Sequence, residues 1–385
     1  MRAAGLRVLL AVQGEGRGHM TQALALAGML RRRGHAVVGA VVGTDRWGDV
    51  PAFFRRGLGA PVETVESPGL VSDAAGRVRP AATLLRALRQ PARYRASLDR
   101  LSVILDRDEP DVVVNFYEAL VGAHSQLRVS DVPTVAVGHQ FMASHPGYPL
   151  LPGQPVQRAA MQAYTALVGA GASARLALSF YDAPSRGALV TPPLLRDSLM
   201  SLAGREKRDE ILVYLMQPRL APELAAWSDR NPGVRLHAFA PVEPHRHSPA
   251  LTFHGLSGRA FLERMAVARG VVCTAGFETV SEAMWLGTPA YMVPTPGHYE
   301  QRCNAADAAA VGAGLVGESL DLDPFLDYLG HHTADPGPFR QWVARAEGLA
   351  VGAVEQAAGW APVAGGDGEA AAGDLTLGVG RAWAP

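Results

Sequence analysis

The residues most able to do chemistry in this sequence surround one short turn within the segment 271–305. An apolar run, Val271–Cys273, is typical of a buried parallel strand. It ends at Thr274-Ala275-Gly276, where glycine permits a sharp turn and the close approach of a ligand. A helix is expected next, over 277–286. A strand–glycine–helix junction points backbone N–H groups and the positive end of a helix dipole at one place, which suits a phosphate group.

Carboxylates and amides follow this turn along the chain. Glu282 comes about one turn into the expected helix, where it could accept hydrogen bonds from vicinal hydroxyls. A second apolar strand, 290–293, and a Pro/Gly loop then lead to a polar cluster of His298, Glu300, Gln301 and Asn304. Phosphate and diol recognition together predict a nucleotide site. The plain alternative is an ordinary βαβ unit whose loop is polar by chance.

This segment resembles the donor-binding signature of GT-B glycosyltransferases, which include the murein N-acetylglucosaminyltransferase and the UDP-glycosyltransferases. It is closer still to a bacterial and archaeal family with the pattern AGFE…SEA…G.P…P…H.EQ..NA, and the resemblance covers about residues 5–325. The resemblance implies that the pyrophosphate is received at the helix start, by Gly276, Phe277 and Thr279. It implies that Glu282 binds ribose and that Glu300 and Gln301 face the donor sugar. We expect further donor contacts from Thr274, Glu278, His298 and Gln217, the last at the end of a strand over 211–215.

Length and composition bound the class of protein. A chain of 385 residues with 48% hydrophobic residues suggests two α/β domains. The formal net charge is zero, so the charge balance gives no case for nucleic acid as a partner. Two cysteines make no disulfide framework, and no segment reads as a signal peptide or membrane span. We therefore expect a soluble, cytoplasmic protein.

The chain opens with a βαβ pattern whose turn contains three glycines before His19. The strand 6–12, the helix 20–33 and the strand 35–42 could pass for a dinucleotide site. A Rossmann NAD site would need an acid at the end of the second strand, and none is there. The turn resembles the G.GH turn of GT-B acceptor domains, with Gly16 and Gly18 leaving room for substrate. His19 is then a candidate general base, unless it only caps or packs the helix.

Two further strands are expected to deliver polar residues to the same cleft. The strand 112–114 precedes Asn115, Tyr117 and Glu118, and the strand 134–137 precedes His139. Ligands lie at the carboxyl ends of parallel strands, so these are candidate acceptor-side residues, with Glu118 and His139 as candidate catalytic groups. Glu118 competes with His19 for the role of base, or orients it. The alternatives are a helix-start glutamate and a buried, satisfied histidine.

Three other patterns are interpreted without a catalytic role. The Arg-rich helical stretch 81–105, interrupted by Pro91, fits either a surface helix or a peripheral membrane contact. Asp106-Arg107-Asp108 mimics a DxD metal motif but falls in an expected loop at the wrong end of the sheet. Glu243, His245 and His247 lie in a Pro-rich surface loop, which disfavours a metal site.

These interpretations predict an α/β fold of two Rossmann-like, doubly wound domains facing a cleft (GT-B). We expect an acceptor domain over 1–196, a nucleotide-sugar domain over 209–334, a helical segment 335–360 crossing back, and a low-complexity tail 361–385. The resemblance implies transfer of a sugar, from a UDP-sugar, with inversion and without a metal or cofactor. The acceptor is a lipid, a glycan or a small molecule. A UDP-sugar 2-epimerase and a non-catalytic nucleotide-sugar-binding protein are the alternatives.

Overall fold

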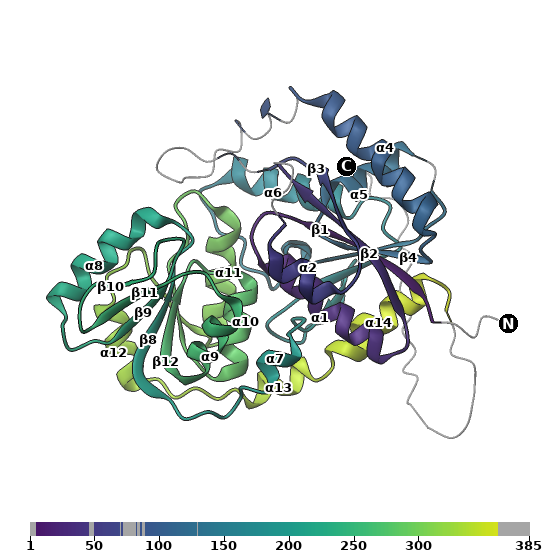
Figure 1. Cartoon of the computed structure of the whole chain (residues 1–385). Helices are drawn as coiled ribbons and strands as arrows, with labels where there is room; N and C mark the ends of the chain where they lie inside the picture. Colours follow the sequence, from purple (N-terminus) through teal and green to yellow (C-terminus); the bar gives the residue numbers. More distant parts are fainter. Residues whose placement is uncertain are drawn as a thin grey trace, which may run out of the picture.

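The computed structural model describes residues 5–45, 50–69, 71, 82, 85–86, 89–128 and 130–360. Two seven-stranded sheets lie side by side, each with its own covering helices (Figure 1). The predicted fold class, two doubly wound α/β domains, is confirmed. The tail 361–385 and part of the Arg-rich stretch 81–90 lie outside the described residues.

The first sheet has the order β3-β2-β1-β4-β5-β6-β7, and each of its pairings is parallel. Alternate residues of β1 serve opposite faces: Val8 and Leu10 join one apolar cluster, while Leu9 and Ala11 join another under α4. A strand buried on both faces explains the continuous apolar runs in this sequence. The strands are β1 (Arg7–Gln13), β2 (Ala36–Thr44), β3 (Val62–Glu66), β4 (Val112–Phe116), β5 (Thr134–Gly138), β6 (Ala174–Leu178) and β7 (Leu189–Thr191).

The helices of the first domain connect these strands. They are α1 (Gly18–Arg32), α2 (Ala52–Leu58), α4 (Pro91–Asp108), α5 (Ala119–Leu127), α6 (Pro155–Val168) and α7 (Asp197–Met200), with a 3₁₀ turn η1 (His139–Ser144). Pro91 lies in the first turn of α4, where its missing N–H costs no helical hydrogen bond.

The second sheet has the order β10-β11-β9-β8-β12-β13-β14, with antiparallel pairing only at the short β10 edge among the described pairings. Its strands are β8 (Arg208–Tyr214), β9 (Leu236–Phe239), β10 (His245–Arg246), β11 (Leu251–His254), β12 (Ala268–Cys273), β13 (Ala290–Met292) and β14 (Gly314–Val316). Its helices are η2 (Pro218–Leu220), α8 (Ala221–Arg230), α9 (Gly258–Val267), α10 (Phe277–Leu286), α11 (Tyr299–Ala310) and α12 (Asp323–His331).

The C-terminal helices return to the first domain. After α13 (Gly337–Val343), α14 (Ala346–Ala357) packs against α1 and strands β4 to β7 (Figure 1, yellow). Glu347 accepts hydrogen bonds from Arg32 at 2.9 and 2.8 Å, and Glu355 lies 3.0 Å from His35 Nε2. Trp342 donates from Nε1 to the carbonyl of Ser179 at 3.0 Å. These contacts tie the end of the described chain to the first domain.

One local prediction is wrong. Asp106-Arg107-Asp108 forms the last turn of α4 and is not a loop, and Arg107 there pairs with Glu63 at 2.7 Å. The polar cluster of His298, Glu300, Gln301 and Asn304 lies at the start of α11, which begins at Tyr299 and is capped by His298.

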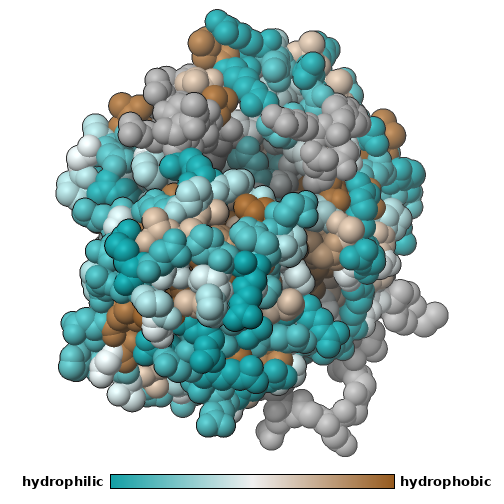
Figure 2. Space-filling view, turned by 60° about the vertical axis from the view of Figure 1, so that its left-hand side comes forward, coloured by the Kyte–Doolittle hydropathy of each residue, from teal (hydrophilic) through white to brown (hydrophobic). Residues whose placement is uncertain are grey.

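Among the described residues, no helix combines the length and the apolar character that crossing a membrane requires. On the face shown in Figure 2, hydrophobic residues are scattered among hydrophilic ones.

Candidate functional site

Each sheet has one point where the strand order reverses, and the two points face each other. They lie between β1 and β4 in the first sheet and between β8 and β12 in the second. Ligands of open α/β sheets bind outside the carboxyl ends of the strands at such points. A cavity of about 280 Å³ occupies this place, lined from one side by 15–19 and from the other by 276–279.

One wall of the cavity, formed by the second domain, is the turn between β12 and α10. Ala275 has a positive φ of 60°, a conformation that costs a non-glycine residue on the order of 1–3 kcal/mol. Gly276 caps α10, and a Cβ placed there would meet no atom within 4 Å. The helix start therefore opens directly onto the cavity, which Thr274, Phe277 and Thr279 also line.

Glu282 lines the cavity one turn further along α10. Glu282 is only 3% exposed, and its carboxylate accepts a hydrogen bond from Arg196. Burial raises the pKa of Glu282, while the Arg196 guanidinium works against that rise. Arg196 belongs to the segment after β7, so this ion pair joins the two domains.

The first turn of α11 completes this second-domain wall. His298 caps the helix, its Nδ1 accepting from the N–H of Gln301 at 3.4 Å. The Gln301 Oε1 accepts from the N–H of Thr295 at 2.8 Å, and Gln217 donates to the Thr295 hydroxyl at 3.3 Å. Glu300 and Gln301 line the cavity. Gln217 and His298 support that wall from behind, since neither belongs to the lining.

The wall formed by the first domain is the glycine turn after β1. Gly16 has φ 79°, which favours glycine, and Gly18 starts α1. His19 lines the cavity from the first turn of α1, and its ring stacks on Tyr117 with centroids 5.6 Å apart. Its Nδ1 is buried without a hydrogen-bond partner in the described structure. Burial lowers the pKa of His19, although the Glu300 carboxylate across the cavity opposes this.

Glu118 is buried behind this wall. It caps α5 by accepting from the N–H of Leu120 at 3.0 Å, and the same Oε1 accepts from the Ser67 hydroxyl at 2.5 Å. Burial raises the pKa of Glu118 to about 7, although the Leu120 and Ser67 bonds lower it. Its neighbour Asn115 holds the backbone of Glu118 by two bonds, at 2.8 and 3.1 Å. None of these side chains, nor Tyr117, belongs to the cavity lining.

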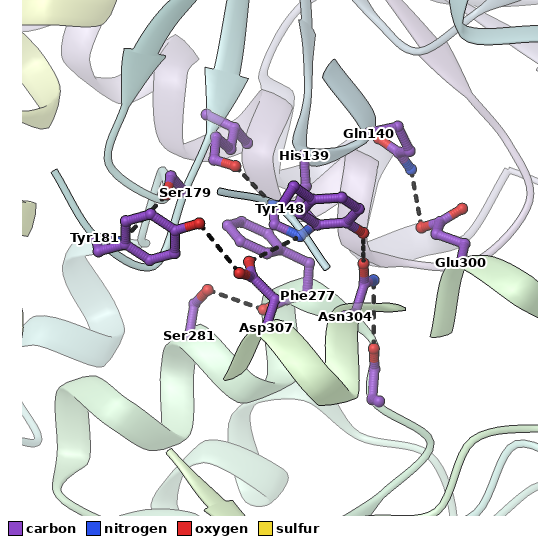
Figure 3. A network of polar contacts seen from close by, with 12 residues as sticks. His139, Gln140, Tyr148, Ser179, Tyr181, Phe277, Ser281, Glu300, Asn304 and Asp307 are labelled. Carbon is purple, nitrogen blue, oxygen red and sulfur yellow. Dashed lines mark hydrogen bonds and ion pairs between the residues drawn. The ribbon is translucent and has the colours of Figure 1, made fainter. Parts of the chain in front are cut away.

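His139 joins the two domains, as Figure 3 shows. Its ring stacks on Phe277 with centroids 4.1 Å apart, and its Nδ1 donates to the carbonyl of Leu178 at 2.6 Å. Burial lowers the pKa of His139 to about 4, so the ring is neutral at neutral pH. Its Nε2 lies 3.8 Å from Asp307 Oδ2. This histidine lines the cavity but is mainly a packing element of the domain interface.

Several bridging residues were not predicted from sequence. Gln140 donates to Glu300 at 3.0 Å, and the Tyr148 hydroxyl donates to Asn304 at 2.9 Å (Figure 3). The Tyr181 hydroxyl donates to Asp307 at 3.2 Å. Glu300, Asn304 and Asp307 share one face of α11, and that spacing was the available signal. Their partners lie more than a hundred residues away in sequence, and no local pattern marks them.

Metal-ligand spacing is absent from the site. Among the residues that the structure describes, no group of three or more His, Cys, Asp or Glu side chains could hold a metal ion. Asp106 and Asp108 lie on α4, and neither lines the cavity.

Comparison with known proteins identifies the family of the chain. The model of the family described as glycosyl transferase family 1 matches residues 6–331. A similar protein from Nocardia farcinica is 28% identical over 346 residues, covering 83% of this chain and 85% of its own. It is called UDP-N-acetylglucosamine--N-acetylmuramyl-(pentapeptide) pyrophosphoryl-undecaprenol N-acetylglucosamine transferase. A relative of the same name from Rhodococcus opacus is 29% identical over 337 residues, covering 79% of this chain and 81% of its own.

Solved structures show the same fold at low identity. The calicheamicin glycosyltransferase CalG4 matches with a TM-score of 0.60 at 18% identity, covering 93% of this chain and 99% of its own. MurG of Acinetobacter baumannii matches with a TM-score of 0.53 at 15% identity, covering 91% and 99%. The two facing domains are thus the GT-B arrangement of glycosyltransferase structures.

Proposed function

Because the chain belongs to glycosyl transferase family 1, we propose that it transfers a sugar from a UDP-sugar to an acceptor hydroxyl, with inversion and without a metal. One observation carries this proposal. A single cavity between the two switch points has an open helix start on one wall and His19 on the other. The first wall suits a diphosphate, and the second offers a base to an acceptor.

The donor would lie along the second domain. Its diphosphate would accept hydrogen bonds from the N–H groups at the start of α10, beside Gly276 and Thr279. Arg196 occupies Oε1 of Glu282, which leaves Oε2 for the ribose hydroxyls. Glu300 and Gln301 would face the sugar. The printed names of the relatives support a UDP-linked N-acetylhexosamine as the donor class.

The reaction would proceed by direct displacement. His19 takes the proton of the acceptor hydroxyl, and the oxygen attacks the anomeric carbon on the face opposite the diphosphate. The bond from that carbon to the phosphate oxygen breaks, and its electron pair stays on the leaving diphosphate. The N–H groups at the start of α10 stabilise the charge that develops there. A metal ion is not needed for this step, because preorganised donors supply the stabilisation.

The acceptor is the least constrained part of the proposal. The relatives act on a pyrophosphoryl-undecaprenol compound, so a lipid-linked acceptor is one candidate, beside a glycan or a small molecule. Exposed apolar side chains lie on the contacting helices α4, α5 and α6, namely Val103, Leu127 and Val156. With the arginines of α4 they would suit peripheral contact with an anionic membrane. We place the protein in the cytoplasm, where its two buried free cysteines would stay reduced.

A thermal-shift panel of UDP-, GDP- and dTDP-sugars tests the donor assignment, followed by acceptor screening with the best donor. We expect stabilisation by a UDP-sugar and turnover of that donor only when an acceptor is present. Isomerised UDP-N-acetylglucosamine in the absence of an acceptor would favour a 2-epimerase. Binding without consumption under any acceptor would favour a nucleotide-sugar-binding protein, although such a protein has no need of His19 opposite the donor.

A further inference from the structure

The second residue of α10, Glu278, is a buried acid without a partner in the proposed donor site. It is 7% exposed, it lines the cavity, and both carboxyl oxygens lack a hydrogen-bond partner in the described structure. Its Cβ packs against Gly18 of the opposite domain, 3.5 Å from the position of a Cβ there. An unpaired polar group at such depth is costly unless something else occupies the space beside it.

The surroundings of Glu278 favour its neutral form. Burial raises the pKa of Glu278 well above the ordinary value, and the Glu282 carboxylate one turn away raises it further. Two groups oppose this rise: Arg196, which already pairs with Glu282, and the Gln22 side chain, which approaches Glu278 from α1 and lowers its pKa. The helix start favours an anion, but a carboxylate there would compete with the diphosphate for the same N–H groups. The other ionisable groups lining the same cavity are Glu15, Arg17, His19, His139, Arg196, Tyr214, Cys273, Glu282 and Glu300.

The charges of the cavity lining also favour a neutral Glu278. The cavity lining holds four glutamates, namely Glu15, Glu278, Glu282 and Glu300, against two arginines, Arg17 and Arg196. A nucleotide diphosphate brings further negative charge into this space. A fourth carboxylate at the helix start would repel it, whereas a protonated carboxyl group would attract it as a hydrogen-bond donor.

We propose that Glu278 is a donor-binding residue that acts as a neutral carboxylic acid, donating a hydrogen bond to the diphosphate of the nucleotide sugar. This inference rests on the proposed function and deepens it. No proton is transferred: the O–H group stays on Glu278 while the leaving diphosphate gains charge. The consequence is that donor affinity falls as pH rises through the titration of this acid, because ionised Glu278 repels the diphosphate.

The test is calorimetric titration of the full chain with UDP-N-acetylglucosamine from about pH 6 to about pH 9, a range that covers raised carboxyl pKa values. Glu278→Leu removes the donor and should weaken binding about tenfold or more, the scale of a lost hydrogen bond to a charged group. Glu278→Gln keeps an N–H donor that does not titrate, so the fall of affinity at high pH should disappear. Glu347→Gln, whose site lies outside the cavity lining, is the matched control and should keep both the affinity and its fall at high pH.

Two results would overturn the inference alone: Glu278→Leu binding as tightly as the unmodified chain, or an affinity of the unmodified chain that rises with pH. In both, the UDP-sugar still binds and the proposed function stands. If the unmodified chain does not bind the probe at any pH, the proposed donor class fails and the inference fails with it. Thermal denaturation of each variant confirms that the compared proteins are folded.

Discussion

The two walls of the interdomain cavity differ in how their polar groups are used. On the donor side, Gly276 leaves the start of α10 open, and Glu278 and Glu282 line the same space. On the acceptor side, Glu118 turns back to cap α5. His19 and His139 both line the cavity, but the ring of His139 stacks on Phe277. Donor binding would therefore depend on many groups of the second domain, whereas the chemical step would depend on a single side chain of the first domain.

The sharpest way to separate the two walls is His19→Ala. We expect turnover to fall by about 10²–10⁴, the usual cost of removing a general base. Donor affinity should stay nearly constant, because the donor would be held by the opposite wall. Single-turnover rates at saturating donor, with calorimetric donor titration as the control, measure both quantities. Unchanged turnover would remove His19 from the role of base.

A substitution on the donor side should instead lower donor affinity. Glu282→Gln should weaken donor binding by roughly 1–3 kcal/mol, the scale of a charge-assisted hydrogen bond. Since Glu282 is buried and paired with Arg196, thermal denaturation must accompany the titration. Glu347→Gln, which breaks the pair with Arg32 outside the cavity, is the matched control and should leave affinity unaltered. An unaltered affinity in folded Glu282→Gln would exclude the carboxylate from the site.

A smaller effect is expected from Glu118→Gln. The amide oxygen can still accept from Leu120 and Ser67, so the cap of α5 survives and stability should change by about 1 kcal/mol or less. Turnover should fall less than tenfold, because Glu118 does not line the cavity. Single-turnover rates of Glu118→Gln and His19→Ala, measured side by side, test this expectation. If Glu118→Gln lost more turnover than His19→Ala, the two residues would exchange roles.

No effect at all is the expectation for metal removal. Turnover with the best donor should be the same in a chelator as in added magnesium or manganese, because the helix start supplies the stabilisation of the leaving group. Loss of turnover in the chelator, restored by the metal, would show that this stabilisation is insufficient.

The turn and helix of the donor-side wall could be predicted from the sequence because they are adjacent in the chain. The strand, the glycine turn and the carboxylate one turn later fall within 271–286, where helical and strand periodicity fix their relative positions. Periodicity also predicted the two parallel sheets, whose strands are apolar on both faces.

The contacts between the two walls could not be predicted from the sequence in this way. Arg196 reaches Glu282 across 86 residues, and Gln140 reaches Glu300 across 160. Such pairs are set by how the domains pack, which no local spacing encodes. The position of Glu118 was unpredictable for the same reason. A glutamate after a strand can face a cleft or cap the next helix, and here it caps α5 and accepts a hydrogen bond from the distant Ser67.

The central claim, that a nucleotide sugar binds where α10 starts, is tested most directly by titrating Gly276→Val with UDP-N-acetylglucosamine. A Cβ at Gly276 meets no atom within 4 Å, so the fold should tolerate valine while its side chain fills the space of the phosphate. Gly233→Val is the matched control, since its Cβ also meets open space and Gly233 lies outside the cavity lining. We predict that Gly276→Val abolishes binding and that Gly233→Val retains it. Binding by folded Gly276→Val as tight as that of the unmodified chain would contradict the account.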